Sequence, residues 1–464
     1  MPINKRESFY RNTNHLNMKN TFLLLLILVL FSMPDLSLAQ FTVDGQIVQR
    51  AEFRNGAGRL IGVDQDPAAF MAHRMRLQTR YEMDDFTFYA SIQDVRTWGS
   101  TPQAKATDPF LSLHEAWAET SLADYWKIKL GRQELNYDNV RFLGNLDWAL
   151  QARAHDFALI KYEKEKMKIH FGGGFNQDAQ SLSGNIFFNP NQYKVAQMVR
   201  YENQWGDFKL SALFWNDGRQ FMETDTSGNV INDKVNYSQT IGLPTIKYQL
   251  GNTLFSGFYY HQTGKDVSDR DVNAFDVGAQ VTQTVTSNDE KGSSFKATLG
   301  FEILSGTDNL STEQNNSFNP LYGTNHAHNG YMDLFFVGGR FVNSVGLQDY
   351  YLKGRYQFNP KFFTQIDGHV FAAQAEVKQF GEGGPAITPA VETLDPYLGT
   401  EIDFSFGYIL NRAVSVQGGY SQIFASDTFE ALQGQAQYKN TQNWAYVMFI
   451  FRPTMKNRFI GVLF

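Results

Sequence analysis

The sequence of 464 residues predicts an all-β fold, a transmembrane antiparallel β-barrel of about 18 strands with short periplasmic turns and long extracellular loops. Three observations predict this class. Aromatic residues make up 15% of the chain and charged residues 19%, and there are 38 glycines, which is typical of many strands joined by tight turns. Apolar and polar residues alternate with a period of two along most of the chain. The connections between the alternating segments are short and long in turn.

The first part of the chain resembles a secretory signal. A charged Lys19 precedes an apolar run, Phe22–Met33, of about a dozen residues, whereas a spanning helix needs about 20. Ser37 and Ala39 supply the small residues of a cleavage site before Gln40. We therefore expect residues 1–39 to be a signal peptide with an upstream extension, with Met18 as an alternative start to Met1.

We assign residues 40–452 to the barrel because of the alternation. The segments RMRLQTRYEM (74–83) and SFKATLGFEI (294–303) place an apolar residue at every second position, as expected of a strand between lipid and an aqueous interior. The expected strands are 41–54, 70–83, 86–97, 112–122, 125–135, 154–163, 166–175, 192–203, 207–217, 236–250, 253–263, 273–284, 294–304, 346–358, 361–374, 397–410, 413–424 and 441–452.

The ends of these strands distinguish a membrane barrel from a large soluble all-β protein, which also alternates. Aromatic residues such as Tyr81, Trp126, Trp205 and Tyr248 recur at strand ends, as in the interfacial girdles of membrane barrels. A sheet in lipid must also close, because an open edge leaves backbone amides unpaired.

Two C-terminal segments compete for the last strand. Strand parity selects Trp444–Phe451, and Pro453 cannot donate to a strand ladder. We therefore expect residues 453–464 to form a periplasmic C-terminal tail that docks at the barrel mouth or mimics an insertion signal.

One block of the chain is similar to a known family. The segment KLGRQELNYDNVRFLGNLDWALQARAHDF (129–157) resembles the signature of the alginate-export family of bacterial outer-membrane proteins. The matching positions are Leu130, Gly131, Arg132, Gln133, Asp138, Asn139, Arg141, Phe142, Gly144, Trp148, Gln151 and Asp156. The segment FNPLYGTNHAHNGYMDLF (318–335) resembles a loop of the same family, whereas Val140 replaces its usual Gln. The resemblance implies a single-chain barrel with an arginine-rich constriction for an anionic polysaccharide.

Basic residues are the candidate substrate-binding residues of the pore lining, because low-dielectric walls strengthen the attraction of a cationic lumen for carboxylates. The candidates are Arg74, Arg76, Arg80, Lys127, Lys129, Arg132, Arg141, Arg153, Lys353 and Arg355. An alternative is an internal salt-bridge network with Glu52, Glu82, Glu115 and Glu119. Arg132, Arg141 and Arg153 could instead hold down the loop 136–153, and the loop 305–345 is the candidate constriction.

Motifs of catalysis and metal binding are weak. HEAWA (114–118) begins like a zinc-protease helix, but Ala118 occupies the position of the second histidine and the pattern is that of a strand. His326 and His328 lie in a long polar loop, and FGGGF (171–175) lacks the lysine of a phosphate-binding loop. The chain has no cysteine, which excludes disulfides and thiolate sites. We expect no catalytic residues, no metal, no cofactor and no nucleic-acid partner.

These observations, together with the resemblance, lead us to expect a monomeric, non-enzymatic channel in the outer membrane of a Gram-negative-type bacterium. It would pass an anionic, alginate-like poly- or oligosaccharide by passive diffusion. Its partners would be that polysaccharide, outer-membrane lipid and the barrel-assembly machinery. The alternatives are a general porin for small anions or nutrients and a non-transporting barrel scaffold of a surface complex.

Overall fold

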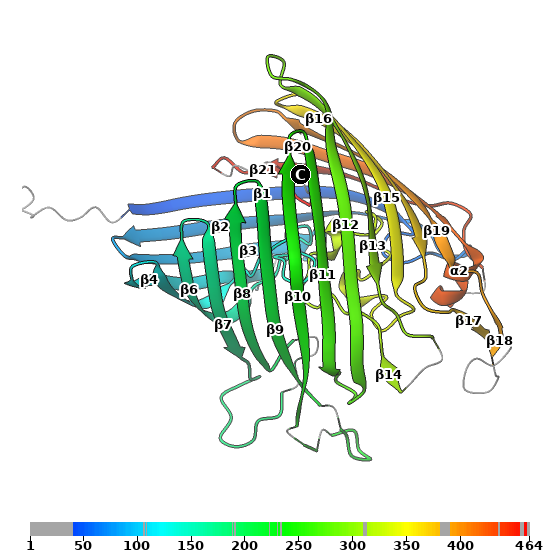
Figure 1. Ribbon diagram of the computed structural model, residues 1–464, viewed down its shortest axis with the longest axis horizontal. Helices are drawn as coiled ribbons and strands as arrows, with labels where there is room; N and C mark the ends of the chain where they lie inside the picture. Colours follow the sequence, from blue (N-terminus) through cyan, green and yellow to red (C-terminus); the bar gives the residue numbers. More distant parts are fainter. Residues whose placement is uncertain are drawn as a thin grey trace, which may run out of the picture.

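The computed structural model describes residues 40–104, 107, 109–187, 189, 192–221, 223–229, 231–232, 234–309, 313–380, 390–434, 437–454 and 459–461. The expected signal peptide lies outside the described residues. The main sheet has 19 strands, of which one, β14 (Gln314–Asn315), is only two residues long and pairs in parallel with the start of β12. The other eighteen are antiparallel and form the barrel (Figure 1).

The eighteen barrel strands confirm all the predicted segments, with ends that differ by a few residues. They are β1 (Gln40–Asn55), β2 (Ala68–Met83), β3 (Phe86–Thr97), β4 (Leu111–Ala123), β5 (Trp126–Gln133), β6 (His155–Lys164), β7 (Met167–Phe175), β8 (Val195–Trp205), β9 (Phe208–Gln220), β10 (Val235–Leu250), β11 (Thr253–Lys265), β12 (Asp271–Asn288), β13 (Ser293–Leu304), β15 (Leu347–Asn359), β16 (Phe362–Ala372), β19 (Tyr397–Ile409), β20 (Val414–Ala425) and β21 (Gln442–Phe451).

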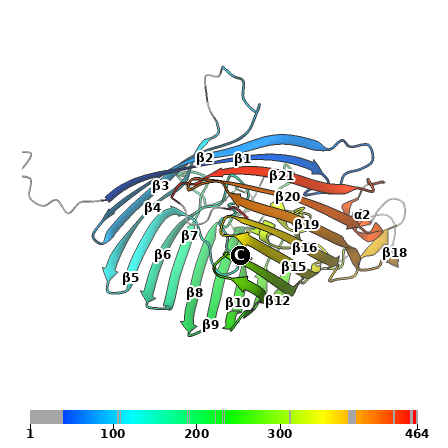
Figure 2. The ribbon, with the colours of Figure 1, turned by 90° about the horizontal axis from the view of Figure 1, so that it is seen from above.

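The barrel closes between its first and last strands. β1 pairs with β2 on one side and with β21 on the other, with Ile47 opposite Phe451 and Arg54 opposite Trp444. Figure 2 shows β1 and β21 side by side. Closure leaves no open edge, which is what a sheet in lipid requires. Phe451 ends the closing strand, as the sequence predicted.

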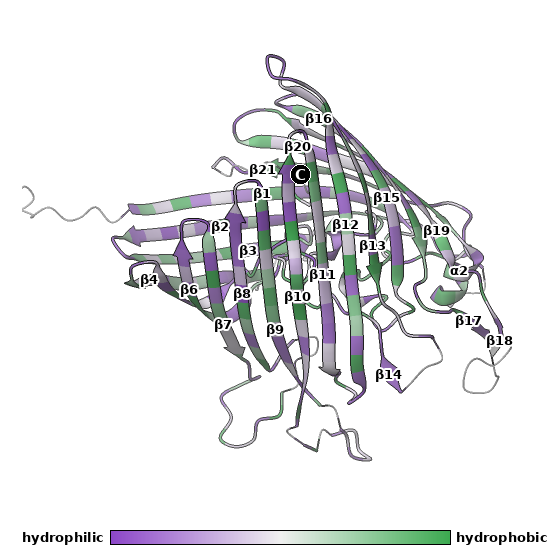
Figure 3. Ribbon diagram, in the orientation of Figure 1, coloured by the Kyte–Doolittle hydropathy of each residue, from purple (hydrophilic) through white to green (hydrophobic). Residues whose placement is uncertain are grey.

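The two faces of the barrel have opposite chemistry. Side chains at alternate positions point outward and are apolar, including Leu299, Leu352 and Ile366, which are 67%, 60% and 58% exposed. The strands of Figure 3 accordingly alternate between hydrophobic and hydrophilic residues. Exposing so much apolar surface to water is unfavourable, whereas the hydrocarbon core of a membrane accommodates it. Among the described helices, none is both long and apolar enough to span a membrane.

The connections follow the predicted rhythm, and the extracellular ones contain structure that the sequence pattern did not reveal. The hairpin β17 (Lys378–Phe380) and β18 (Ala390–Thr393) and the helix α2 (Asp427–Gln433) lie in these loops. At seven residues, α2 is too short for a helical period to show, although Ser426 caps it by accepting from the Phe429 amide.

Candidate functional site: the barrel lumen

Two long loops fold into the lumen and pack against several walls of the barrel. The first lumen loop is residues 134–154, between β5 and β6, and the second is the described residues 305–309 and 313–346, between β13 and β15. In the first loop, Phe142 packs at 6.2 Å from Trp215 of β9, measured between ring centroids. In the second, Phe335 lies 4.7 Å from Phe371 of β16. The second loop therefore narrows the lumen, as the sequence predicted.

Arg141 of the first lumen loop joins both loops to the wall. It is fully buried, and its Nε and Nη2 atoms donate to the two carboxylate oxygens of Glu302 on β13 at 2.7 Å each. Its Nε also lies 3.4 Å from Asp276 on β12. Nη2 donates to Asn329 of the second loop, and the Asn329 amide donates to Glu302 at 2.8 Å. This charge-assisted network fixes the two loops against one wall.

Asp147 attaches the tip of the first lumen loop to the barrel wall opposite β12 and β13. Its carboxylate lies 2.8 Å from Arg74 of β2 and 2.7 Å from Arg452, directly after β21. Burial alone would raise the pKa of Asp147, but the charges of Arg74 and then Arg452 outweigh burial and hold that pKa well below its usual range. The two arginines therefore favour the charged form of Asp147, which holds the loop against β2 and the end of β21.

An aromatic stack joins the two lumen loops to each other. The rings of Trp148 and His326 lie parallel with their centroids 3.9 Å apart. Trp148 also contacts Trp444 and Tyr446 of β21 edge-on, at 5.8 and 5.1 Å. The Arg50 guanidinium lies 4.5 Å from the Trp148 ring centroid. Trp148 is thus the residue on which both loops and the β21 wall converge.

The described part of the C-terminal tail also lies inside the barrel. Phe459 is 7% exposed and packs at 5.2 Å against Phe363 of β16. The buried Ile460 donates its amide to Gln417 Oε1 at 3.0 Å and accepts from Gln417 Nε2 at 2.8 Å. A side chain at Gly461 would collide with the Trp148 ring. Phe459–Gly461 therefore occupy the lumen beneath the first loop.

Gln417→Leu should release this segment. The change removes both hydrogen bonds to Ile460 and leaves buried backbone groups unpaired, which costs about 1–3 kcal/mol for each group. The chain has no cysteine, so Ile460→Cys provides a single reporter. We expect maleimide labelling of that reporter to become faster with Gln417→Leu. Gln422→Leu is the control, since Gln422 on the same strand donates to Gln442 and not to the tail. Equal labelling rates in all three proteins would contradict the docked position.

Four of the predicted pore residues lie on the inner wall between β2 and β5. Arg76 is buried and donates to Gln93 at 2.6 and 3.0 Å, whereas Arg80 pairs with Glu82 at 2.7 Å. Lys127 lies 3.6 Å from Glu119, and Lys129 lies 3.8 Å from the centroid of the Trp117 ring. Arg80 and Lys127 thus form ion pairs with Glu82 and Glu119. These pairs fit the internal salt-bridge network that the sequence analysis gave as the alternative.

The other predicted residues are distributed elsewhere in the lumen. Arg153 donates to the Gly323 carbonyl at 2.9 Å and so links the two lumen loops; burial lowers its pKa to about 10. Lys353 lies 3.7 Å from Asp367, and Arg355 stands 3.6 Å over the Phe363 ring. These two residues are on β15, half the circumference away from β5. The predicted basic residues therefore do not form one ring.

The position of Arg132 corrects the prediction that this residue lines the pore. It shares the outward side of β5 with the exposed Leu130 and forms an ion pair at 3.0 Å with Asp156 on β6. Its side chain is 39% exposed. Gln133, the next residue of the strand, is fully buried. Since neighbouring residues of a strand point to opposite faces, Arg132 points away from the pore. Its charge lies at the extracellular end of the strand, where a long side chain can reach headgroups.

A cavity of about 200 Å³ lies at the periplasmic end of the lumen. Its walls come from the start of β13, the end of β15, the following turn, the start of β16 and the tail. The lining residues are Ser294, Lys296, Arg355, Gln357, Pro360, Lys361, Phe363 and Phe459. Three of these residues are cationic and none is acidic. Sequence parity directs Lys296 and Arg355 inward, but nothing local reveals that Lys361 and Phe459 join them.

Comparisons with known proteins show similarity of fold. No protein-family model matches the chain, and no curated protein matches it. The resemblance to the alginate-export family therefore stays a prediction from the motifs.

Solved structures of outer-membrane porins do match. The chain is similar to OccK1 (OpdK) of Pseudomonas aeruginosa, with a TM-score of 0.54, 10% identity, and coverage of 88% of this chain and 98% of that one. A structure of OpdK with vanillate gives the same TM-score and coverage at 9% identity. OccK9 (OpdG) of the same organism matches at 0.54 and 12% identity, over 88% of this chain and 97% of that one. The eighteen-strand barrel thus has the fold of these porins.

Proposed function

We propose that this protein is a non-enzymatic outer-membrane channel for the passive diffusion of small organic anions. The observation that carries this proposal is the periplasmic cavity, whose described lining includes the three cations Lys296, Arg355 and Lys361 and no acidic residue. A carboxylate entering it gains attraction to three cations in a region partly shielded from water. Phe363 and Phe459 add apolar surface for the organic part of the solute.

The folded loops favour small solutes. Together they place buried aromatic side chains across the middle of the lumen, and Trp148, Phe335 and Phe336 are at most 6% exposed. A porin of the same fold has been solved with vanillate, an aromatic carboxylate small enough for such a passage. By analogy of fold and of cavity chemistry, we propose carboxylates of this size as the substrate class.

The anionic, alginate-like polysaccharide is the second candidate. The motif at residues 129–157 and the basic wall of Lys127 and Lys129 favour it. On this hypothesis the partner is the polymer, and the lumen loops must leave the passage before it can thread. On either hypothesis, we expect the barrel to act as a monomer in outer-membrane lipid after the assembly machinery has inserted it.

Planar-bilayer recordings test the proposal. Replacing Lys296, Arg355 and Lys361 together by glutamine should lower the anion-to-cation permeability ratio and weaken current block by benzoate about tenfold. The matched control is Lys265→Gln, because Lys265 pairs with Asp269 and Asp271 at the far, extracellular end. Unchanged selectivity in the triple variant would refute the cavity as the anion site. Block by uronate oligomers that strengthens with their length would favour the polysaccharide.

A further inference from the structure

Two consecutive residues of β4, His114 and Glu115, are both buried, although a regular strand would point them to opposite faces. A β-bulge explains this. Ser91 pairs with Glu115 and the next residue of β3, Ile92, pairs with Leu113, so His114 is the extra residue without a partner. Bulges redirect side chains and recur beside functional sites. This one brings an imidazole and a carboxylate together.

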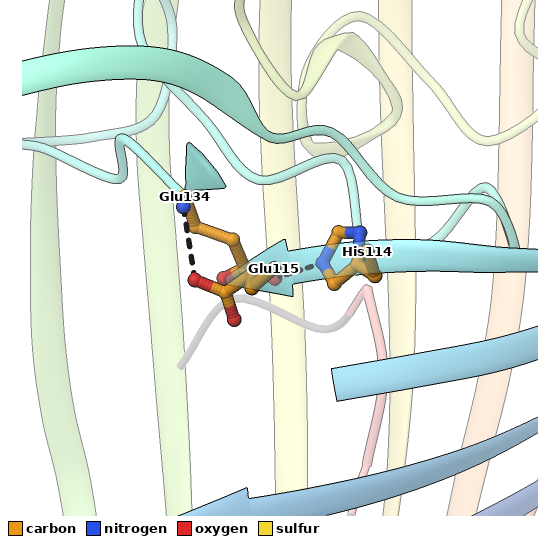
Figure 4. A group of neighbouring side chains, drawn as sticks. All are labelled: His114, Glu115 and Glu134. Carbon is orange, nitrogen blue, oxygen red and sulfur yellow. Dashed lines mark hydrogen bonds and ion pairs between the residues drawn. The ribbon is translucent and has the colours of Figure 1, made fainter. Parts of the chain in front are cut away.

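Glu134 completes a group of three (Figure 4). It is the first residue after β5, and His114 Nε2 lies 2.8 Å from Glu134 Oε1. The Glu134 amide donates to Glu115 Oε1 at 3.1 Å. One nitrogen and two carboxylate oxygens, one from each residue, lie within 4.8 Å of one another. A bound ion can therefore contact all three side chains after small rotations.

The charge around the group points to a cation. Two carboxylates lie together, and among the described residues no Lys or Arg side chain comes within ion-pair distance of Glu115; the charge of Lys129 acts on it from farther away. Arg76 is the nearest cation to Glu134, at 3.9 Å from Nη1 to Oε1, and its other donors are directed to Gln93. Adjacent carboxylates repel each other, and a divalent cation bound between them would remove this repulsion.

We propose that His114, Glu115 and Glu134 bind a first-row divalent metal ion such as Zn²⁺. An imidazole nitrogen and two carboxylate oxygens form a mixed set that suits Zn²⁺, whereas Ca²⁺ takes six to eight oxygens. The site joins the wall of β4 to the root of the first lumen loop, since Asn145 of that loop donates to Glu134 Oε2 at 2.9 Å. Bound metal would therefore hold the loop in its inserted position.

Titration of the untagged, folded barrel with Zn²⁺ by calorimetry, with metal analysis after dialysis, tests the proposal. We expect one Zn²⁺ for each chain in the wild type. Affinity should fall about tenfold or more in His114→Ala and in the nearly isosteric Glu115→Gln. His170→Ala is the matched control, because His170 is another buried lumen histidine that pairs with a single carboxylate, Glu163, at 3.1 Å.

Three outcomes would overturn the site. One is the absence of Zn²⁺ binding to the wild type. Another is an unchanged affinity in both His114→Ala and Glu115→Gln. The third is an equal loss in His170→Ala, which would place the metal elsewhere. Heat-modifiable migration on gels confirms that each variant is a folded barrel before it is titrated. None of these results depends on which solute the channel passes, so this inference and the proposed function can fail separately.

Discussion

Arg141→Leu is expected to destabilise the barrel by about 3–5 kcal/mol, because removing one member of a buried ion pair leaves an uncompensated charge. The guanidinium is fully buried, pairs with Glu302 at 2.7 Å and lies 3.4 Å from Asp276 on the adjacent strand. Both oxygens of Asp276 lack any hydrogen-bond donor among the described residues. Among the described residues, the two carboxylates would then face each other with no Arg or Lys side chain at ion-pair distance.

The loss of Arg141 should also change conductance. Arg141 bonds to Asn329 and Glu302, so its removal breaks one of the links that hold the first lumen loop to the second and its direct ion pair with β13. We expect larger and noisier single-channel currents, together with a lower urea midpoint for unfolding in detergent. Arg141→Lys keeps the charge but loses the two-pronged contact with Glu302, so its effects should lie between those of wild type and Arg141→Leu.

The outward ion pair provides a control for Arg141. Arg132→Leu removes a cation of the same type from the same region of the chain, but the Arg132–Asp156 pair is about half exposed. Exposed pairs contribute about 0–1 kcal/mol, so stability and conductance should stay close to those of wild type. If Arg141→Leu and Arg132→Leu had equal effects, the proposed role of the buried network would be wrong.

Trp148→Ala is expected to have a comparable effect through packing, about 3–5 kcal/mol. Its ring fills the space between His326, Trp444 and Tyr446, and Gly461 lies against it. Truncation would leave a cavity that these partners, held on different elements, cannot all close. Since both lumen loops meet at this ring, we expect the mean conductance to rise.

Two further variants separate packing at Trp148 from a general loss of aromatic surface. Trp148→Phe retains a ring that can stack on His326, so its conductance should rise less than that of Trp148→Ala. Trp205→Ala removes a tryptophan that is 52% exposed on β8, outside the lumen, and its conductance should not change. A conductance of Trp148→Ala equal to that of wild type would show that the loops stay in place without this contact.

The positions of the strands were predictable because their cause is local. In a strand between lipid and the lumen, apolar and polar residues must alternate, so segments such as 294–303 can be recognised from the sequence. Closure and the last strand followed from an even number of strands and from Pro453. Arg132 was grouped with Lys127 and Lys129 as a cation at the end of the same strand, although the alternation of β5 directs it to the opposite face.

The contents of the lumen were less predictable, since their contacts join residues far apart in the chain. Arg141 meets Glu302 across 161 positions, and Trp148 packs on Trp444 of the last strand. No period or motif encodes such pairs. The sequence sets HEAWA aside as a zinc motif, because Ala118 replaces the second histidine and the pattern is that of a strand. Only the bulge opposite Ser91 turns His114 and Glu115 to one side.

By itself, the sequence determined that the chain forms eighteen strands and which residues belong to each. It also determined that one face of each strand is apolar, because alternation with a period of two is a local property of each segment. Only the tertiary structure decided that the first lumen loop folds inward beside the second, that three of the seven predicted arginines (Arg74, Arg141 and Arg153) pair with buried acids or loop carbonyls, and that three cations meet at the periplasmic end. Those outcomes depend on which distant side chains share the enclosed space, and closure of the barrel sets that space.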